Sequence, residues 1–482
     1  MVPRKREILV RLIRAFISGQ DFPEDVQRIS DEFGTDQRER SICRALAMSA
    51  MGLPLEGDGG ELPLNQCARR SLERENVVSP PLTVLRCACN GCESSRIRVT
   101  DLCQNCVDKP CIASCKFGAI GNDGTRSVID VKKCKKCSAC VRACPYGAIV
   151  KTIVPCENVC PVGAIGKDEE GRATIDFSKC ISCGKCIAAC PFETIQPRSQ
   201  VIDVLKAIKS KRKVIALAAP ALFGQFSCSA GKLHAAIKKI GFALVYEVAI
   251  GAELTSLHEA KDLEERLGRG EKFMTTSCCA AYGGLVKKHI PELKPFVSTA
   301  GTPLFYTAKY VKKEHADGVL VFISPCLAKY EEVFANEDVD YVLNFEEIGA
   351  LFDALSIVAG ECAEENFDYE TAKEAREFAL SGGVSRAIQS AHGDGGAKVQ
   401  FAAINGIDRE AVKDLKRFAQ AGECDGGNVL EVMSCPGGCV GGGLACCPVA
   451  AATRCVKSYG EKGPPLADRA KEDSPPKEEN NS

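Results

Sequence analysis

The sequence predicts an α/β protein with largely parallel sheets, preceded by a cysteine-rich region and a small helical N-terminal region. Between residues 200 and 458, apolar strand-like runs alternate with helical stretches such as 258–266 and 365–380. The strand-like runs are 214–221, 242–250, 319–326, 399–406 and 429–435. Such alternation is typical of βα units, which build parallel sheets.

Three other regions complete the expected organisation. Residues 1–80 are charged and helical in pattern, with breaks at Gly19, Pro23, Pro54, Pro63 and Pro80-Pro81. Residues 81–199 hold seventeen of the cysteines among short strand and turn patterns. Residues 459–482 are rich in proline and charge, so we expect a disordered tail there.

Charge and hydropathy exclude several classes of partner. Lysine and arginine total 62 against 63 acidic residues, which favours neither a nucleic-acid nor an anionic-membrane partner. The N-terminal stretch resembles an amphipathic helix and not a signal peptide, because Arg11 and Arg14 interrupt its apolar residues. No apolar run approaches the roughly 18 residues of a membrane span. We therefore expect a cytoplasmic protein.

The thirty cysteines are the dominant feature of the composition. Disulfide-rich chains are usually short and secreted, whereas this chain is long and has α/β patterning. Only five histidines are present, which weakens a zinc or non-haem iron site built on imidazole. Groups of thiolates without histidine are suited to iron–sulfur clusters.

An internal repeat organises the cysteine-rich region. Residues 134–145 and 180–191 both match the C-x2-C-x2-C-x3-C-P run of bacterial ferredoxins. Upstream of each run, a C-x3-C pair at 111–115 and 156–160 precedes the same Gly-Ala-Ile sequence. We interpret the region as two consecutive ferredoxin-like units.

The ferredoxin pattern assigns three sets of four thiols, each to one [4Fe–4S] cluster, with structural zinc as the alternative. The sets are Cys103, Cys106, Cys111 and Cys144 (site 1); Cys115, Cys134, Cys137 and Cys140 (site 2); and Cys160, Cys180, Cys183 and Cys186 (site 3). A fourth set (site 4) would combine Cys156 and Cys190 with Cys89 and Cys92, and Cys87 competes for a place in it.

Three further cysteine motifs lie in the α/β region, each after a strand-like run. They are Thr275-Thr-Ser-Cys278-Cys279-Ala-Ala-Tyr282, Ser324-Pro-Cys326-Leu-Ala-Lys329-Tyr-Glu-Glu332 and Glu431-Val-Met433-Ser-Cys435-Pro-Gly-Gly-Cys439-Val-Gly-Gly-Gly443. The ends of strands are where α/β folds usually place their sites. Four of the five thiols suffice for one more cluster, which leaves one of the adjacent Cys278 and Cys279 beside it.

In order and spacing, these motifs resemble the three H-cluster motifs of [FeFe]-hydrogenases, over roughly residues 201–443. The resemblance implies two α/β lobes around a [4Fe–4S] cubane bridged to a diiron subsite with CO, cyanide and a bridging dithiolate. It assigns the cubane to Cys279, Cys326, Cys435 and Cys439, with Cys439 as the bridge. Cys278 would pass protons to the bridging amine, Lys329 would donate to a cyanide, and Met433 would pack against the diiron unit.

The resemblance also implies a proton relay through Glu259, Ser298 and Asp262, with Asp262 in place of the family's outer glutamate. From the residues alone, a solvated acidic helix face and an ordinary serine explain these positions equally well. A thiol with an ordinary pKa of about 8.5 can exchange a proton near neutrality.

Several positions depart from the commonest pattern and resemble the divergent clostridial group B enzymes. Ala280 replaces a proline, Tyr282 a tryptophan and Ser324 a methionine, while Leu304 and Leu444 each replace a glutamine. None of these changes removes a ligand of the cluster.

The sequence therefore predicts a hydrogenase catalysing 2H⁺ + 2e⁻ ⇌ H₂, with ferredoxin or a similar electron carrier and the hydrogenase maturation proteins as partners. An iron–sulfur scaffold without a diiron site is one alternative, and the presence of Cys278, Lys329 and Met433 together argues against it. A hydrogen sensor is the other; such proteins usually carry an added signalling domain, and no pattern of one follows Ser458.

Overall fold

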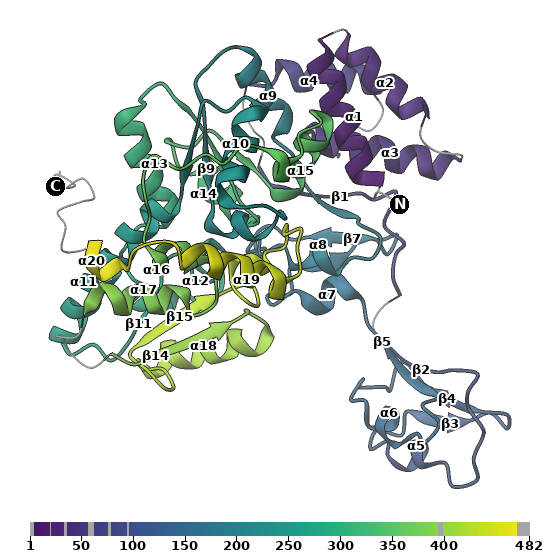
Figure 1. The fold of residues 1–482 in the computed structure, drawn as a ribbon. Coiled ribbons are helices and arrows are strands. Elements are labelled where there is room, and N and C mark those ends of the chain that lie inside the picture. Colours follow the sequence, from purple (N-terminus) through teal and green to yellow (C-terminus); the bar gives the residue numbers. More distant parts are fainter. Residues whose placement is uncertain are drawn as a thin grey trace.

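A computed structural model of the chain shows an α/β body with helical and cysteine-rich regions attached to it (Figure 1). The described residues are 4–19, 21–32, 36–55, 62–75, 79–93, 96–393 and 399–469. In this part of the chain, no helix is both long and apolar enough to cross a membrane.

The N-terminal region is helical, as the sequence predicts. Its helices are α1 (Arg4–Ser18), α2 (Phe22–Glu32), α3 (Gln37–Ala50) and α4 (Leu64–Glu73). Asp36 caps α3 by accepting a hydrogen bond from the backbone N–H of Glu39 at 2.8 Å. The apolar stripe of α1, including Ile8 and Leu12, is buried in the core that the region shares with the body.

The cysteine-rich region consists of short strands and single-turn helices. They are β1 (Leu82–Val84), β2 (Arg96–Val99), α5 (Pro110–Ala113), β3 (Ile120–Asn122), β4 (Ser127–Ile129), α6 (Ala139–Ala143), β5 (Ile149–Thr152), α7 (Pro155–Val159), β6 (Ile165–Lys167), β7 (Ala173–Ile175), α8 (Lys185–Ala189) and β8 (Ile195–Pro197). Each strand pairs antiparallel with one partner: β1 with β8, β2 with β5, β3 with β4 and β6 with β7.

This pairing corrects the expected order of the two ferredoxin-like units. Strand β1 pairs with β8 across more than a hundred residues, and the complete β2–β5 unit lies between them. One unit (residues 96–152, called the inserted unit) therefore interrupts the other instead of preceding it. Arg96 pairs with Thr152, so both ends of the inserted unit leave through one two-stranded neck. Figure 1 shows this unit set apart from the body.

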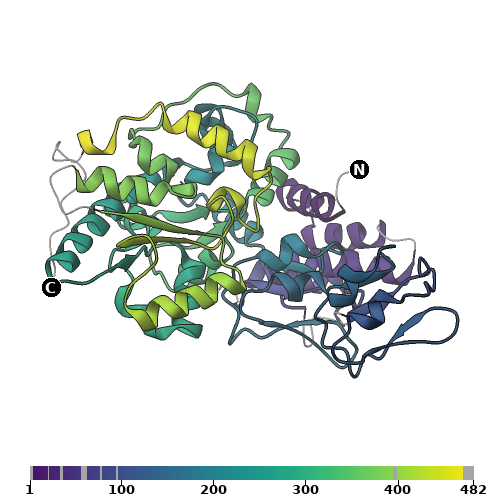
Figure 2. The same ribbon diagram turned by 90° about the horizontal axis from the view of Figure 1, so that it is seen from below.

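The α/β body contains two parallel sheets, which form its two lobes (Figure 2). The first sheet has the order β10-β9-β12-β13, with β9 (Val214–Ala218), β10 (Leu244–Glu247), β12 (Val319–Ile323) and β13 (Tyr341–Leu343). The second has the order β11-β15-β14, with β11 (Met274–Thr275), β14 (Phe401–Asn405) and β15 (Val429–Met433).

Helices cover both faces of each sheet. They are α9 (Val201–Lys209), α10 (Ala230–Ile240), α11 (Ala249–Gly268), α12 (Ala280–His289), α13 (Pro303–Glu314), α14 (Ala328–Phe334), α15 (Phe345–Ala354), α16 (Lys373–Arg376), α17 (Gly383–His392), α18 (Arg409–Ala421), α19 (Val449–Gly460) and α20 (Leu466–Arg469), with 3₁₀ turns at Pro220–Gly224, Pro291–Phe296, Ala359–Glu361, Glu377–Ala379 and Cys439–Gly441.

Strand β15 shows why its sheet is covered on both faces. Its residues are all buried, and successive side chains of a strand point to opposite faces. Val429 and Met433 join a core with α11 and α17, whereas Leu430 and Val432 join a core with α12 and α18. A parallel strand with two apolar faces reads as a nearly continuous apolar run. In β15 only Glu431 interrupts that run, and its buried carboxylate accepts hydrogen bonds from the backbone N–H groups of Gly382 and Ser385.

Two expectations about secondary structure are wrong. The predicted helix at 365–380 forms only from Lys373, because Tyr369 and the backbone N–H of Ala372 bind the buried carboxylate of Glu253. The predicted disordered tail begins too early, because α19 reaches Gly460 and α20 follows. Residues 470–482 of that tail lie outside the described part of the chain.

Candidate functional site

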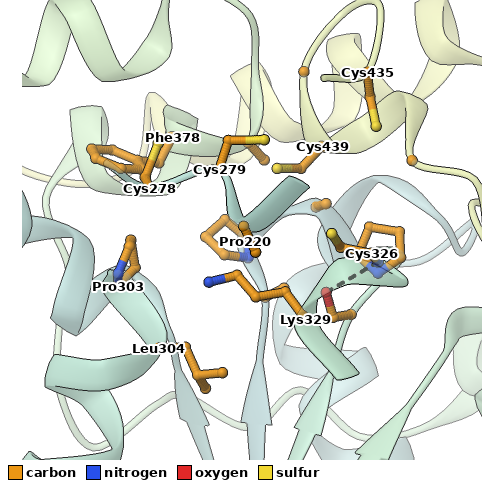
Figure 3. A pocket seen from close by; sticks show the side chains of 18 of the residues that line it. Pro220, Cys278, Cys279, Pro303, Leu304, Cys326, Lys329, Phe378, Cys435 and Cys439 are labelled. Carbon is orange, nitrogen blue, oxygen red and sulfur yellow. Dashed lines mark hydrogen bonds between the residues drawn. The ribbon is translucent and has the colours of Figure 1, made fainter. Parts of the chain in front are cut away.

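The three motifs of the α/β body meet at one cavity between the lobes (Figure 3). Strands β11, β12 and β15 end at Thr275, Ile323 and Met433, and a motif cysteine follows each end within a few residues. The cavity is lined by all five motif thiols, Cys278, Cys279, Cys326, Cys435 and Cys439, and by Lys329, Met433, Ser324 and Leu304. The thiols of the three motifs therefore lie at strand ends, as expected from the sequence.

Four of the five thiols face a shared space. In Figure 3, Cys279, Cys435 and Cys439 come from the upper lobe and Cys326 from the lower one, while Cys278 lies to the side next to Phe378. Burial, together with the neighbouring thiols, raises the pKa of Cys326 to about 11 and that of Cys439 to about 12. Burial likewise raises the pKa of Cys435. Thiols this close become thiolates together only beside a compensating cation, so the donor set fits an iron–sulfur cluster.

Cys278 occupies a different environment from the four facing thiols. Its side chain is 9% exposed, and burial raises the pKa of its thiol well above the ordinary value. The nearby carboxylate of Glu259 raises it further, ahead of Cys279. Cys278 is therefore a protonated thiol beside the cavity, within electrostatic range of a buried carboxylate.

Lys329 reaches into the same cavity from α14 (Figure 3). Burial alone would lower the pKa of this ammonium, but Glu332 raises it by accepting a hydrogen bond from Nζ at 2.5 Å. Thr302 donates to the other carboxylate oxygen of Glu332, also at 2.5 Å. The ammonium group of Lys329 therefore places a positive charge in the cavity, where it is suited to bind an anionic ligand.

The glycines of the third motif serve backbone packing. Gly438 has φ +92°, and a side-chain carbon there would lie 2.5 Å from the carbonyl oxygen of Ala379. A carbon on Gly443 would lie 2.8 Å from the carbonyl oxygen of Gly184, in the loop that carries Cys183 and Cys186. These glycines therefore let the third motif pack closely against the neighbouring loops.

The three proposed relay residues lie close together at α11, but their hydrogen bonds differ from the expected order. Glu259 is fully buried, and its Oε1 accepts hydrogen bonds from Ser277 N at 2.8 Å and Ser277 Oγ at 3.2 Å. Ser298 Oγ accepts from the N–H of Ala300 at 3.2 Å instead. Burial raises the pKa of Glu259 to about 7, near the value that suits proton transfer at neutral pH.

Asp262 is held one turn further along α11. Burial alone would raise the pKa of this carboxyl, but hydrogen bonds from Thr299 and Arg266 lower it overall. Arg266 Nε donates to Asp262 Oδ1 at 2.8 Å, and Thr299 N donates to Oδ2 at 2.8 Å. Ser277 and Arg266 were not predicted from the sequence, although Ser277 is adjacent to Cys278 and Arg266 follows Asp262 by four residues.

Sites 1, 2 and 3 each form one compact pocket lined by all four thiols assigned to it. In each site the residue before the second cysteine of a C-x2-C pair has a left-handed backbone: Asn105, Lys136 and Ser182, with φ of 46°, 56° and 52°. That turn brings both thiols of the pair to the same side of the loop. The structure therefore brings each of these three sets of thiols together at one pocket.

Site 4 is the counterpart of site 1 in the interrupted unit. The N–H of Ala173, at the start of β7, donates to Cys89 Sγ at 3.4 Å, and the N–H of Ser127, at the start of β4, donates to Cys103 in site 1. Gly91, before Cys92, has the same left-handed backbone as Asn105, with φ of 56°.

Cys156 of site 4 lies within electrostatic range of both Cys190 and Cys92. Burial, together with the neighbouring Cys190 and Cys92, raises the pKa of Cys156 to about 11. Cys87, the competitor, donates to the carbonyl oxygen of Ser41 in the helical region at 3.5 Å. The insertion thus explains why the first two thiols of site 4 are so far from the others in sequence.

Site 3 adjoins the central cavity. Cys183 lines both the pocket of site 3 and the cavity between the lobes. The loop that carries it packs against Gly443 of the third motif.

The comparisons with known proteins agree with this geometry. Residues 212–443 match the family model of the iron only hydrogenase large subunit, C-terminal domain. Residues 127–150 match a 4Fe-4S binding domain, and residues 151–201 match the LdpA Fe-S cluster-binding domain. The chain belongs to the iron-only hydrogenase family and carries iron–sulfur cofactors.

Among individual proteins, the chain is similar to the periplasmic [Fe] hydrogenase large subunit of Nitratidesulfovibrio vulgaris, at 31% identity over 65% of this chain and 85% of that protein. It is 29% identical to the NADP-reducing hydrogenase subunit HndD of Solidesulfovibrio fructosivorans, over 44% of this chain but only 45% of HndD. A solved structure of a variant of [FeFe]-hydrogenase HydA1 from Chlamydomonas reinhardtii aligns with 54% of this chain and 88% of that chain, at 21% identity and a TM-score of 0.44.

Proposed function

We propose that the chain is an [FeFe]-hydrogenase that interconverts protons, electrons and dihydrogen at the cavity between its lobes. The observation that carries the proposal is the combination of four facing thiols with Cys278 and Lys329 in one cavity. A scaffold for cubane clusters needs only the four thiols. The additional protonated thiol and buried ammonium are the groups that proton reduction at an anionic metal site requires.

The residues present fit an H-cluster. Cys279, Cys326, Cys435 and Cys439 would hold the cubane, with Cys439 also bridging to the diiron subsite, and Lys329 would donate to a cyanide. Met433 and Leu304, both buried, line the cavity and would keep water from it. The bound cofactor would supply the redox chemistry of hydrogen formation and cleavage.

Protons would reach the cavity through residues of this chain. Cys278 would give and take the proton at its Sγ, and Glu259, with a pKa raised to about 7, would reload it. Ser298 and Asp262 would connect Glu259 with the surface, and the hydrogen bonds of Glu259 add Ser277 to this relay. Because Asp262 is paired with Arg266, it would accept a proton only transiently.

Electrons would pass through the accessory sites to the cavity. We propose four accessory [4Fe–4S] clusters, at sites 1 to 4, with site 3 next to the H-cluster. The relatives include electron-transfer proteins such as HydN of Escherichia coli, 37% identical over 59 residues. An electron carrier is therefore the expected partner; ferredoxin as that carrier, and the maturation proteins, are part of the proposal.

Iron analysis tests the number of clusters. Five cubanes and one diiron unit give about 22 iron atoms per fully matured chain, and about 18 if site 4 is empty. We expect the higher value, with Cys89→Ala and Cys156→Ala each lowering it by about four. Cys87→Ala is the matched control and should keep all iron. Zinc in place of iron, with fewer than about 12 iron atoms, would contradict the ferredoxin-type assignment.

A substitution at Leu304 tests whether the departures from the family pattern change the spectrum or the potential of the site. The side chain is 1% exposed and lines the cavity, so it offers an apolar surface where many relatives of this type have a hydrogen-bonding glutamine. Leu304→Gln should shift the infrared bands of the diiron ligands or the operating potential, at unchanged iron content. Leu444→Gln is the comparison, because Leu444 does not line the cavity. An unchanged spectrum and potential for Leu304→Gln would place this residue away from the cofactor.

A further inference from the structure

We propose that a small acidic electron-carrier protein docks on the inserted unit, against the lysine-rich face beside site 2. The inference rests on the proposed hydrogenase function, for which this unit would be the entry point of electrons. It names the surface and the kind of partner that surface fits.

The inserted unit differs sharply in charge from the rest of the chain. Residues 96–152 contain eleven lysine and arginine residues but only four aspartates and no glutamate, a formal charge of +7. The whole chain carries −1, so the remaining residues carry −8. Bound clusters with their thiolates would offset part of the +7, but the difference in sign would remain. A charge asymmetry of this size steers the association of an oppositely charged partner.

Much of the positive charge surrounds the ligand loop of site 2. Lys132, Lys133, Lys135 and Lys136 are interleaved with Cys134 and Cys137, and all four lysines are exposed. Lys133 lies 3.8 Å from Asp130. In the described part of the chain, no ion pair engages the other three lysines, so their charge is directed to solvent.

Site 2 is also the accessory site that is most open to solvent. Cys137 is exposed, whereas the other fifteen thiols of the four sites are buried or half-buried. Phe117, which lines site 2, is 47% exposed, and Val131, next to the first lysine, is 56% exposed. Exposed apolar side chains beside a cluster of like charges are typical of a surface for transient binding of a partner.

The position of the inserted unit gives a carrier room to approach. The unit joins the body through the β2–β5 neck and projects away from both lobes (Figure 1). A partner can therefore cover the lysine-rich face without meeting the negatively charged remainder of the chain. A redox protein is the occupant that this surface favours, because the lysines frame a thiol loop assigned to a cluster.

The first test measures hydrogen evolution by the matured wild-type protein with two electron donors. One donor is a reduced acidic [4Fe–4S] ferredoxin, and the other is reduced methyl viologen, a small cationic dye. The KM for ferredoxin should rise about tenfold or more between low salt and about 0.5 M salt, because salt screens exposed charges, whereas the rate with the dye should change little. A salt-independent KM for ferredoxin would overturn the proposal.

The second test reverses the charge of the surface. The variant K132E/K133E/K135E/K136E should raise the KM for ferredoxin at low salt by about tenfold or more and keep the dye-driven rate. The variant K132R/K133R/K135R/K136R should behave like the wild type. The matched control K261E/K313E/K413E/K416E reverses four other lysines, all exposed on the body.

The outcomes separate docking from catalysis. A control variant that impairs ferredoxin as strongly as the surface variant would assign the effect to net charge and overturn the proposed surface. If the glutamate variant loses iron from site 2, the neutral variant K132Q/K133Q/K135Q/K136Q is tested in its place. An unchanged KM for ferredoxin in the neutral variant would also overturn the proposal. Absence of dye-driven hydrogen evolution in the matured wild type would instead contradict the proposed function.

Discussion

Cys278→Ala is expected to lower hydrogen evolution by more than about a hundredfold while the iron content stays at the wild-type value. The side chain is buried beside the four facing thiols, and its pKa is raised by burial and by Glu259, so it would hold the proton closest to the cofactor. Alanine leaves no titratable group between Glu259 and the cavity. Cys278→Asp should recover part of the rate, because a carboxyl can also carry a proton.

The adjacent thiol provides the matched comparison. Cys279→Ala should lose the iron of the cavity, because Cys279 faces the other three thiols and would be a ligand (Figure 3). The measurement is hydrogen evolution with reduced viologen beside iron analysis of each variant. Near-normal turnover of Cys278→Ala would rule out its role as proton donor. Loss of iron from Cys278→Ala, but not from Cys279→Ala, would reverse the two assignments.

Glu259→Gln should have the second largest effect, a loss of about a hundredfold or more in turnover at unchanged iron content. The glutamine keeps the volume of the side chain and an oxygen that can accept from Ser277. It cannot release a proton, so the path to Cys278 would be interrupted. Glu265→Gln, an exposed change on the same helix, is the control and should leave turnover unchanged.

The stability of the Glu259 variant separates a relay from a purely structural role. Burial raises the folded-state pKa of Glu259 to about 7, so ionisation destabilises the fold as the pH rises from the ordinary value of this carboxyl through 7. Glutamine removes that loss, and Glu259→Gln should therefore melt at a higher temperature than the wild type at pH 8 but not at pH 5. A variant that loses turnover together with stability at pH 8 would contradict the relay.

The sequence could predict the thiol sets because metal ligands are grouped by local spacing. A C-x2-C pair needs only one tight turn, and the left-handed residues Asn105 and Ser182 show that turn in the structure. The pairing of β1 with β8 joins residues more than a hundred positions apart, and no local pattern records it. The nested arrangement, and with it the geometry around Cys89 and Cys92, therefore became visible only in the fold.

The parallel sheets, and the meeting of the first and third motifs, also followed from pattern, because β11 and β15 lie in one parallel sheet and their ends share one edge. The second motif follows β12 of the other sheet, so only the packing of the two lobes brings it to the same cavity. The hydrogen bonds of the relay could not be predicted from the sequence pattern. Whether Glu259 binds Ser277 or Ser298 depends on how two loops pack against α11, and no local sequence pattern records that packing. The failed helix at 365–372 has a similar cause, since buried carboxylates on distant elements bind that segment.

Infrared spectroscopy of the anaerobically matured protein shows whether the cavity between the lobes holds an H-cluster. Among the sites proposed for this chain, only the diiron site would carry CO and cyanide ligands and give their infrared bands. We expect such bands in the matured wild type and in Cys278→Ala, and their absence from Cys279→Ala. A matured wild-type protein that contains its cubane iron but shows no CO or cyanide bands would rule out an H-cluster. That result would favour an iron–sulfur scaffold without a diiron site.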